Sequence, residues 1–237
     1  MLNPPDITQR LNGVRDRIAD AARRSGRLPA SVRLVAVSKT FPLDAIRAAA
    51  RSGQIDFGEN KVQEAQAKII GAGSLPVRWH LIGHLQSNKA RKAAALFDTI
   101  HSIESVDVLK KVDEGAAEKG REIDVLIQVD LAGEQTKHGA PESELTAIIE
   151  AAMACRAVRL SGLMALPPAV ENPEDARPYF AGLRTLRDRY VNQGVPADRL
   201  AELSMGMSHD FEVAIEEGAT MVRIGSEIFG ERTYPAE

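Results

Sequence analysis

The amino-acid sequence predicts an α/β protein: a single closed (β/α)₈ barrel with an extra helix at its N-terminal end. Short apolar runs, typical of parallel strands buried on both faces, alternate with segments of helical periodicity. Eight such strand-like runs occur in the sequence. The chain has 237 residues, close to the roughly 250 that one barrel of this kind takes. These observations favour a barrel over an open, doubly wound sheet.

The extra helix is predicted over residues 6–25. Apolar residues recur there at intervals of three and four, as on the buried face of a helix: Ile7, Leu11, Val14, Ile18 and Ala21. Asp6 and Gln9 have the spacing of a capping box, and Gly26 is placed to end the helix.

The strands and helices of the barrel follow in alternation. The predicted strands are residues 33–38, 55–57, 78–82, 98–101, 123–130, 158–163, 201–204 and 221–224. The predicted helices between them are 43–51, 60–70, 87–96, 106–119, 142–154, 174–191 and 209–217. Such alternation indicates parallel strands joined by crossover helices.

No domain boundary is visible along the chain. Residues 165–175 are the segment richest in turn residues, and we interpret them as a long strand-to-helix loop. No Gly-x-Gly-x-x-Gly motif follows the first strand, which weakens a dinucleotide-binding interpretation. We therefore assign residues 1–237 to one domain.

Composition narrows the class of protein. With 44% hydrophobic residues, 27% charged residues and a net charge of −3, the chain is an ordinary globular protein without the charge expected for binding nucleic acid or an anionic membrane. No apolar run approaches a membrane span or a signal peptide, so we expect a cytoplasmic protein. One cysteine, Cys155, excludes an internal disulfide and a cysteine-based zinc site, and we expect it to be a buried, inert thiol.

The first predicted strand ends on a charge. In VRLVAVSKTFP, residues 32–42, a nearly unbroken apolar run leads to Ser38 and Lys39. In such barrels the chemistry lies at the carboxyl ends of the strands. An apolar surrounding lowers the pKa of a lysine and exposes the neutral amine that forms an imine with an aldehyde.

The loops after the seventh and eighth strands have the features of a phosphate site. Barrel phosphate sites are commonly built from these two loops and the start of a short helix. Gly206 and Gly225 would let backbone N–H groups approach an anion, and Ser208 and Ser226 would add hydroxyl donors. A lysine that forms imines and a phosphate site at one barrel mouth suggest a ligand with both an aldehyde and a phosphate, which is pyridoxal phosphate.

Other polar residues at the strand ends have simpler explanations. His80 and His84 are four residues apart, but they lie on a strand and a turn, so we expect no metal site and place His80 inside the barrel. Asp210 and Glu212 begin a helix, where acidic residues are favoured in any case. Asn60, in a loop that faces the barrel mouth, is the harder residue to explain structurally.

Six blocks of sequence carry a resemblance to a known family: LVAVSKT, DFGENKVQEAQAK, WHLIGHLQSNK, GLMAL, LSMGMSHDFEVAI and VRIGSEIFGER. From the first helix to the last few residues, the chain resembles the pyridoxal phosphate homeostasis protein family. The resemblance implies a TIM barrel similar to the N-terminal domain of alanine racemase, without the C-terminal β-domain of that enzyme. It also implies pyridoxal 5′-phosphate (PLP) as the cofactor.

The resemblance further implies a role for each matching residue. Lys39 would form the Schiff base with the cofactor, and Ser208, Gly225 and Ser226 would hold its phosphate. Ser226 stands where a threonine is more usual, but it keeps the hydroxyl.

Two more residues would contact the cofactor ring. Arg223 would face the pyridine nitrogen, and Asn60 would lie near the phenolic oxygen. A permanent positive charge beside the nitrogen disfavours its protonation and makes the ring a poor electron sink, which argues against transamination. Asp130 stands where asparagine is common, and its role is not assigned.

Three functions remain open from the sequence. The first, which the resemblance implies, is a protein that holds, buffers and supplies PLP to PLP-dependent apoenzymes without turnover. The second is an amino-acid racemase, and the third is a phosphate-sugar enzyme that uses no PLP. We expect a monomer, because the domain through which racemases dimerise is absent from the sequence.

Racemisation needs a base on each face of the substrate. Of the three tyrosines, Tyr179 and Tyr190 fall in the helix predicted over residues 174–191, and only Tyr234 is placed to approach the barrel mouth. Tyr234 lies in the C-terminal tail, a poor place to hold a base within the roughly 2.6 to 3.2 Å that proton transfer requires, so we expect no racemase turnover.

Overall fold

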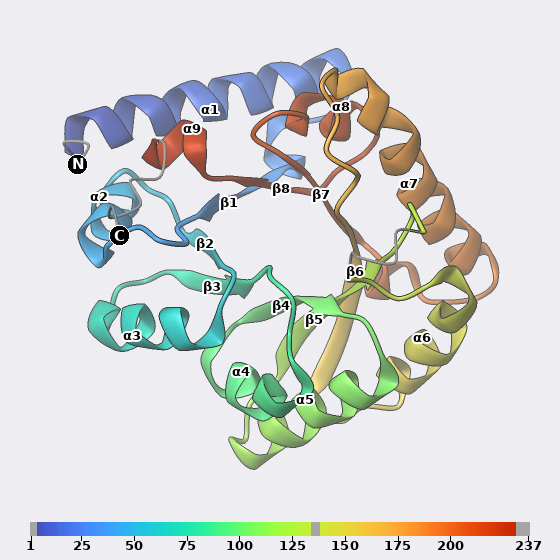
Figure 1. Ribbon diagram of the computed structural model, residues 1–237. Coiled ribbons are helices and arrows are strands. Elements are labelled where there is room, and N and C mark those ends of the chain that lie inside the picture. The colour runs from blue at the N-terminus through green and yellow to red at the C-terminus, as the bar shows by residue number, and fades with distance from the viewer. Residues whose placement is uncertain (1–3, 134–137, 231–237) are drawn as a thin grey trace.

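In the computed structural model, eight parallel strands close into a barrel, and the helices form a layer around it (Figure 1). The structure describes residues 4–133 and 138–230. The strands are β1 Arg33–Val37, β2 Asp56–Glu59, β3 Arg78–Leu81, β4 Thr99–Ile103, β5 Ile123–Val129, β6 Val158–Ala165, β7 Glu202–Met207 and β8 Met221–Ile224. The predicted (β/α)₈ barrel is therefore confirmed.

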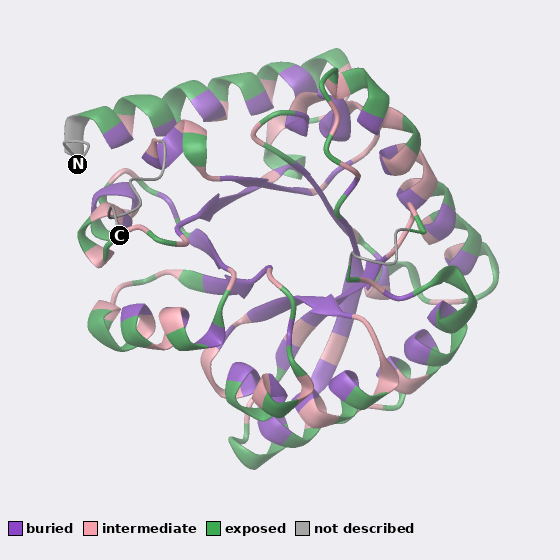
Figure 2. Cartoon of the chain, viewed as in Figure 1, coloured by how far each residue is buried: buried purple, intermediate pink, exposed green. Residues whose placement is uncertain are grey.

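Each strand pairs with the next strand in the sequence, and β8 closes the barrel against β1. Ala36 of β1, for example, pairs with Phe57 of β2 on one side and with Ile224 of β8 on the other. Figure 2 shows the strands buried along nearly their whole length, whereas the helices alternate between buried and exposed residues. Burial on both faces explains why the strands are recognisable as apolar runs.

Nine helices are present among the described residues. They are α1 Pro4–Arg24, α2 Leu43–Arg51, α3 Val62–Ala72, α4 Ala90–Leu96, α5 Val106–Glu118, α6 Leu145–Met153, α7 Arg177–Asn192, α8 Phe211–Glu216 and α9 Ser226–Phe229. The 3₁₀ turns Ser87–Lys89, Glu142–Glu144 and Pro173–Ala176 precede α4, α6 and α7, which is common at helix N-termini. The prediction had included most of these turns in the helices, and it had not included α9.

The extra helix α1 is confirmed, but its predicted start is wrong. The helix begins at Pro4, so Asp6 lies in the first turn and is not the capping residue. Proline is tolerated in a first turn because its missing N–H would have no partner there, and an acidic side chain interacts favourably with the helix dipole. The apolar face of α1 is buried, and the helix packs against α2, α8 and α9 (Figure 1).

No helix in the described ranges is both long and apolar enough to cross a membrane. The assignment of all 237 residues to one domain stays a prediction, since it includes residues outside those ranges.

Candidate functional site

A cavity of about 540 Å³ lies at the carboxyl ends of the strands. Its lining includes all six of the residues assigned from the sequence: Lys39, Asn60, Ser208, Arg223, Gly225 and Ser226. These residues belong to or follow β1, β2, β7 and β8, so closure of the barrel brings them to one mouth. Leu166 and Met207 line the cavity and are exposed, so its rim is open to solvent.

Lys39 lies two residues beyond the end of β1 and is partly buried. The next residue, Thr40, has a φ of 67°, a left-handed conformation that β-branched residues rarely adopt. Its N–H donates to Oε1 of Glu64 at 2.6 Å, which helps to hold the turn. Backbone strain of this kind persists where the surrounding structure enforces it, and it concentrates at functional sites.

Lys68, on α3, supports the turn that carries Lys39. It binds Ser38 directly, and it binds Glu64, which accepts from Thr40. Its buried Nζ donates to the carbonyl of Ser38 at 2.8 Å, to Oε1 of Glu59 at 2.7 Å and to Oε1 of Glu64 at 2.8 Å. Ser38 also donates its hydroxyl proton to Glu59 at 2.6 Å. Burial raises the pKa of the Glu59 carboxyl, and the charge and hydrogen bonds of Lys68, with the bond from Ser38, oppose that rise.

Asn60 presents a polar atom without a protein partner. Its Oδ1 is buried and has no hydrogen bond within the described part of the chain, although the residue lines the cavity. The loop after β3 packs tightly behind it, because a Cβ at Gly83 would lie only 2.4 Å from the carbonyl oxygen of Asn60. An unsatisfied buried amide oxygen is costly, which indicates a missing polar partner in the cavity.

Two hydroxyls and a helix start meet at another part of the cavity wall. The Oγ atoms of Ser208 and Ser226 are 3.3 Å apart. Ser226 is the first residue of α9, and Gly225 precedes it as the N-cap. A Cβ at Gly225 would lie 3.1 Å from the carbonyl oxygen of Val37, so glycine lets the start of α9 lie close against β1.

Gly206 does not have the role predicted for it. It lies within β7, which extends to Met207 and is longer than the predicted strand 201–204. Its φ is 91°, and a Cβ would lie 2.6 Å from Cβ of Ala214 and 2.9 Å from Cα of Phe211. Glycine is therefore required by the packing of α8 against β7, and Gly206 is not among the residues that line the cavity.

Arg223 is buried in β8, and its guanidinium is held at two points. Nη1 donates to Oγ of Ser204 at 2.6 Å, and Nη2 donates to the carbonyl of Ala165 at 2.9 Å. Burial lowers the pKa of Arg223 to about 10, and the nearby Asp210 carboxylate opposes this effect. The guanidinium therefore remains a cation at neutral pH.

A chain of hydrogen bonds leads from Arg223 through the barrel interior. Nδ1 of His101 lies 2.8 Å from Oγ of Ser204, and Nε2 of His101 lies 2.9 Å from Nδ1 of His80. Nε2 of His80 lies 2.8 Å from Oδ1 of Asp56. All five side chains, from Arg223 to Asp56, are buried.

These hydrogen bonds are all satisfied when the protons point in one direction, from Arg223 toward Asp56. Arg223 can only donate, so Ser204 accepts from it and gives its own proton to Nδ1 of His101. His101 and His80 then each donate from Nε2 and accept at Nδ1, and the Asp56 carboxylate accepts at the end. The ionisation states agree with this direction: the hydrogen bond from His80 helps to lower the pKa of Asp56 despite its burial, and burial lowers the pKa of His101 well below its ordinary value.

Most of these hydrogen bonds could not be predicted from the sequence, although the position of His80 inside the barrel is as predicted. His80 is inside the barrel and His84 lines the mouth, as predicted. His101 and Ser204 were not recognised as partners of Arg223. The one available signal was the recurrence of single polar residues within otherwise apolar strands.

The remaining sequence interpretations can be placed on the structure. The Asp210 carboxylate accepts from the backbone N–H of Met207 at 2.7 Å, and Glu212 forms an ion pair with Arg17 at 2.9 Å. Both acidic residues therefore have structural roles. Asp130 accepts from two backbone N–H groups of its own loop.

Cys155 is only half-buried, although it was predicted to be buried. Desolvation and the neighbouring Asp113 raise the pKa of its thiol to about 11, so the prediction of an inert thiol agrees with its environment.

Comparison with known proteins places this cavity in a known barrel family. The family model described as "Alanine racemase, N-terminal domain" matches residues 10–233. The pyridoxal phosphate homeostasis protein of Aquifex aeolicus is 43% identical and covers 95% of this chain and 98% of its own. The protein of that name from Escherichia coli K12 is 41% identical, with coverage of 97% and 98%.

A solved structure adds a ligand to the comparison. PipY of Synechococcus elongatus PCC7942, solved with PLP bound, is 41% identical and superposes with a TM-score of 0.83 over 94% of this chain and 100% of its own. Identity at this level, over nearly the full length of each relative, settles membership. The chain belongs to the pyridoxal phosphate homeostasis protein family, on the barrel of the alanine racemase N-terminal domain.

Proposed function

We propose that this protein binds pyridoxal 5′-phosphate in the cavity at the barrel mouth, and that it holds, buffers and supplies this cofactor. The observation that carries the proposal is the convergence of one amine, two adjacent hydroxyls and a buried guanidinium on a single cavity. The homeostasis proteins with which it shares its family, and the PLP-bound structure of PipY, support this choice of ligand.

Each part of the cofactor has a matching group in the cavity. PLP supplies an aldehyde that can be linked covalently to an amine, and Lys39 supplies the amine. The hydroxyls of Ser208 and Ser226, and the N–H groups at the start of α9 that follow Gly225, are donors suited to the phosphate. The side-chain amide of Asn60, whose N–H₂ group is a donor, suits the phenolic oxygen.

Arg223 determines what chemistry the site favours. Its guanidinium, proposed to face the pyridine nitrogen, is held in place by Ser204 and Ala165. Since it remains charged at neutral pH, it disfavours a proton on that nitrogen and leaves the ring a weak electron sink. This property suits a protein that stores the cofactor more than one that uses it for transamination.

We further propose that the protein has no turnover of its own. Racemisation needs a second proton-transfer group opposite the lysine, and no tyrosine is among the described residues that line the cavity. Tyr179 and Tyr190 lie on α7, where the Tyr190 hydroxyl is 3.1 Å from Oγ1 of Thr146, and Tyr234 lies outside the described residues.

NMR tests this absence of turnover directly. Alanine or serine incubated with the PLP-loaded protein in D₂O should exchange its α-proton far more slowly than an enzyme would. Exchange with inversion at about 1 s⁻¹ or faster would favour the racemase.

The partners that fit this function are PLP-dependent apoenzymes, which would accept the cofactor from a cytoplasmic monomer. The solvent-exposed rim formed by Leu166 and Met207 leaves the cavity accessible to water and to an acceptor. Transfer should appear as recovered activity of an apoenzyme mixed with the loaded protein, and sedimentation should give the mass of one chain. A stable dimer, or recovery no faster than with free PLP, would contradict this part of the proposal.

The absorption spectrum of the PLP-loaded protein tests the site. Lys39→Ala is expected to abolish the visible band of the lysine-linked cofactor while circular dichroism stays unchanged, because Lys39 lies at a loop junction. Lys61→Ala, a lysine on the exposed start of α3, is the matched control and should keep the band. A band that persists in the Lys39 variant would remove Lys39 from the site.

A further inference from the structure

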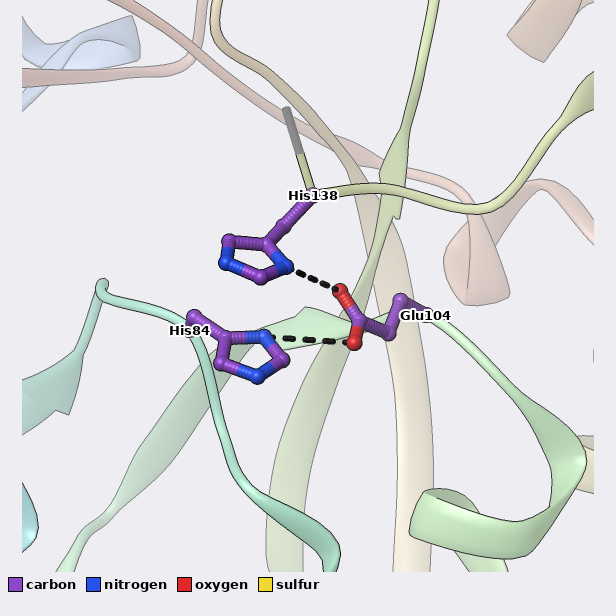
Figure 3. Close-up of side chains that lie close together, drawn as sticks. All are labelled: His84, Glu104 and His138. Atoms are coloured by element: carbon purple, nitrogen blue, oxygen red, sulfur yellow. Dashed lines mark ion pairs between the residues drawn. The ribbon is translucent and has the colours of Figure 1, made fainter. Parts of the chain in front are cut away.

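Three ligand-type side chains from successive strand ends meet at the edge of the cavity. His84 follows β3, Glu104 follows β4, and His138 lies between β5 and α6 (Figure 3). Nδ1 of His84 is 3.2 Å from Oε1 of Glu104, and Nδ1 of His138 is 3.9 Å from Oε2 of the same carboxylate. One ligand atom from each residue lies within 4.8 Å of the others. The carboxylate thus lies between two imidazole nitrogens.

The fold holds this cluster in place from behind. Gly83, which must lack a side chain because it lies against the backbone of Asn60, leads directly into His84. The buried side-chain amide of Gln128, on β5, donates to the carbonyl of His138 at 2.6 Å. His138 is therefore fixed to the barrel through its main chain, although its ring is largely exposed.

One carboxylate oxygen of Glu104 lacks a hydrogen bond among the described residues. Oε2 of Glu104 is buried and has no hydrogen-bond partner in the described part of the chain. The 3.9 Å to His138 is too long for a hydrogen bond. Two ligand atoms on one tetrahedral zinc ion, with bonds of roughly 2.0 to 2.1 Å, lie about 3.3 to 3.4 Å apart.

We propose that His84, Glu104 and His138 bind one divalent transition-metal ion of the zinc class. Two imidazoles and one carboxylate are a ligand set that zinc uses where it keeps a fourth position open. Imidazole ligands favour zinc, copper or nickel over magnesium and calcium, which prefer oxygen. Because both histidines also line the cavity, the open position faces the same space as Lys39.

Metal binding requires one imidazole to turn. The rings are stacked, with centroids 3.6 Å apart and planes inclined by only 10°, whereas a metal ion lies in the plane of each imidazole that binds it. His138 has the room to turn, since its side chain is 56% exposed against 31% for His84.

This site was not expected from the sequence. The spacing of His80 and His84 does not indicate this site, because His80 lies inside the barrel and His84 at its mouth. The partners of His84 come instead from two later loops, 20 and 54 residues further along the chain.

Calorimetric titration of the untagged, PLP-free protein with ZnCl₂ tests the proposal, with MgCl₂ as the comparison metal. We expect one site per chain with a dissociation constant on the order of 1 µM or tighter near neutral pH, and no binding of magnesium. His138→Ala and Glu104→Gln should each weaken zinc binding at least about tenfold, since even residues that only support a metal ligand contribute that much.

His209→Ala is the matched control, because His209 is an exposed histidine outside the cluster, and its Nε2 lies 2.9 Å from the carbonyl oxygen of Glu171. It should bind zinc like the parent protein. The proposal would be overturned if zinc did not bind stoichiometrically or if magnesium bound equally well. It would also be overturned if His209→Ala lost as much zinc affinity as the cluster variants. Unchanged affinity in both cluster variants would also overturn it.

Because His138 is exposed, its replacement by alanine should leave the protein folded, and thermal denaturation checks this point. The titration uses no PLP, so it tests the metal site separately from the proposed function. A protein that binds PLP but not zinc would contradict only the metal proposal, and the reverse result would contradict only the PLP proposal.

Discussion

Replacing Lys68 by methionine should destabilise the protein strongly and disturb the turn that carries Lys39. The substitution keeps a long apolar stem but removes the ammonium that donates to Ser38, Glu59 and Glu64. Glu59 is fully buried, and its Oε2 has no hydrogen-bond partner among the residues that the structure describes. Loss of the cation therefore leaves a buried carboxylate that keeps the hydrogen bond from the Ser38 hydroxyl.

The expected cost is about 3 to 5 kcal/mol, the usual penalty for removing one partner of a buried ion pair. This is a large part of the roughly 5 to 15 kcal/mol by which a typical domain is stable. A second substitution, Glu59→Gln, should recover part of the loss in the Lys68→Met background, because it removes the unpaired charge. Glu64→Gln is the control for the partly exposed partner of Lys68 and should cost about 1 kcal/mol or less.

The penalty should also depend on pH. Burial raises the pKa of Glu59 above its ordinary value, so the folded protein holds this proton more tightly than the unfolded chain. The corresponding stability is present at low pH and is lost as the pH rises through the raised pKa. Because methionine no longer opposes that rise, the Lys68→Met penalty should be larger near neutral pH than at about pH 5.

Urea denaturation followed by circular dichroism measures these free energies of unfolding for the parent, the single variants and the double variant. A loss below about 1 kcal/mol near neutral pH, or an equal loss at both pH values, would refute the reasoning. So would a double variant less stable than Lys68→Met alone.

Three further predictions concern the cofactor site, the buried chain and the thiol. Ser208→Ala should weaken PLP binding by about 1.5 to 3 kcal/mol, roughly 10- to 150-fold, in an absorption titration; unchanged affinity would mean that the phosphate is held elsewhere. Ser204→Ala leaves Arg223 and His101 each short of a partner and should lower the free energy of unfolding by about 1 to 3 kcal/mol in urea; an unchanged midpoint would contradict the contribution of these two hydrogen bonds to stability. Cys155 should react slowly with iodoacetamide near neutral pH, since the pKa of its thiol is about 11; labelling as fast as that of free cysteine would contradict its assignment as inert.

The barrel could be predicted because its physical signals are local. Each strand is buried on both faces, so it appears in the sequence as a short apolar run such as residues 33–37. The ends of strands and helices were predicted less well where the chain has a β-bulge or a proline. The bulge in β7 beside Gly206 extends that strand, and the prolines before Asp6 belong to α1 although the pattern placed the helix start after them.

The six candidate site residues could be proposed because parallel strands in a barrel present their carboxyl ends at one mouth, and because the motifs resemble a known family. Their supporting contacts could not be predicted, since those contacts join residues far apart in the chain. His101 and Ser204 are 103 residues apart, and only closure of the barrel brings them together. The cluster of His84, Glu104 and His138 could not be predicted either, because these residues are also far apart in the sequence.

Peptide mapping tests directly whether Lys39 is linked covalently to the cofactor. The PLP-loaded protein is reduced with borohydride, digested and examined by mass spectrometry. We expect the reduced cofactor on the peptide that contains Lys39 and on no other lysine. Cofactor found on Lys61, Lys68 or Lys89, or on no peptide at all, would contradict it.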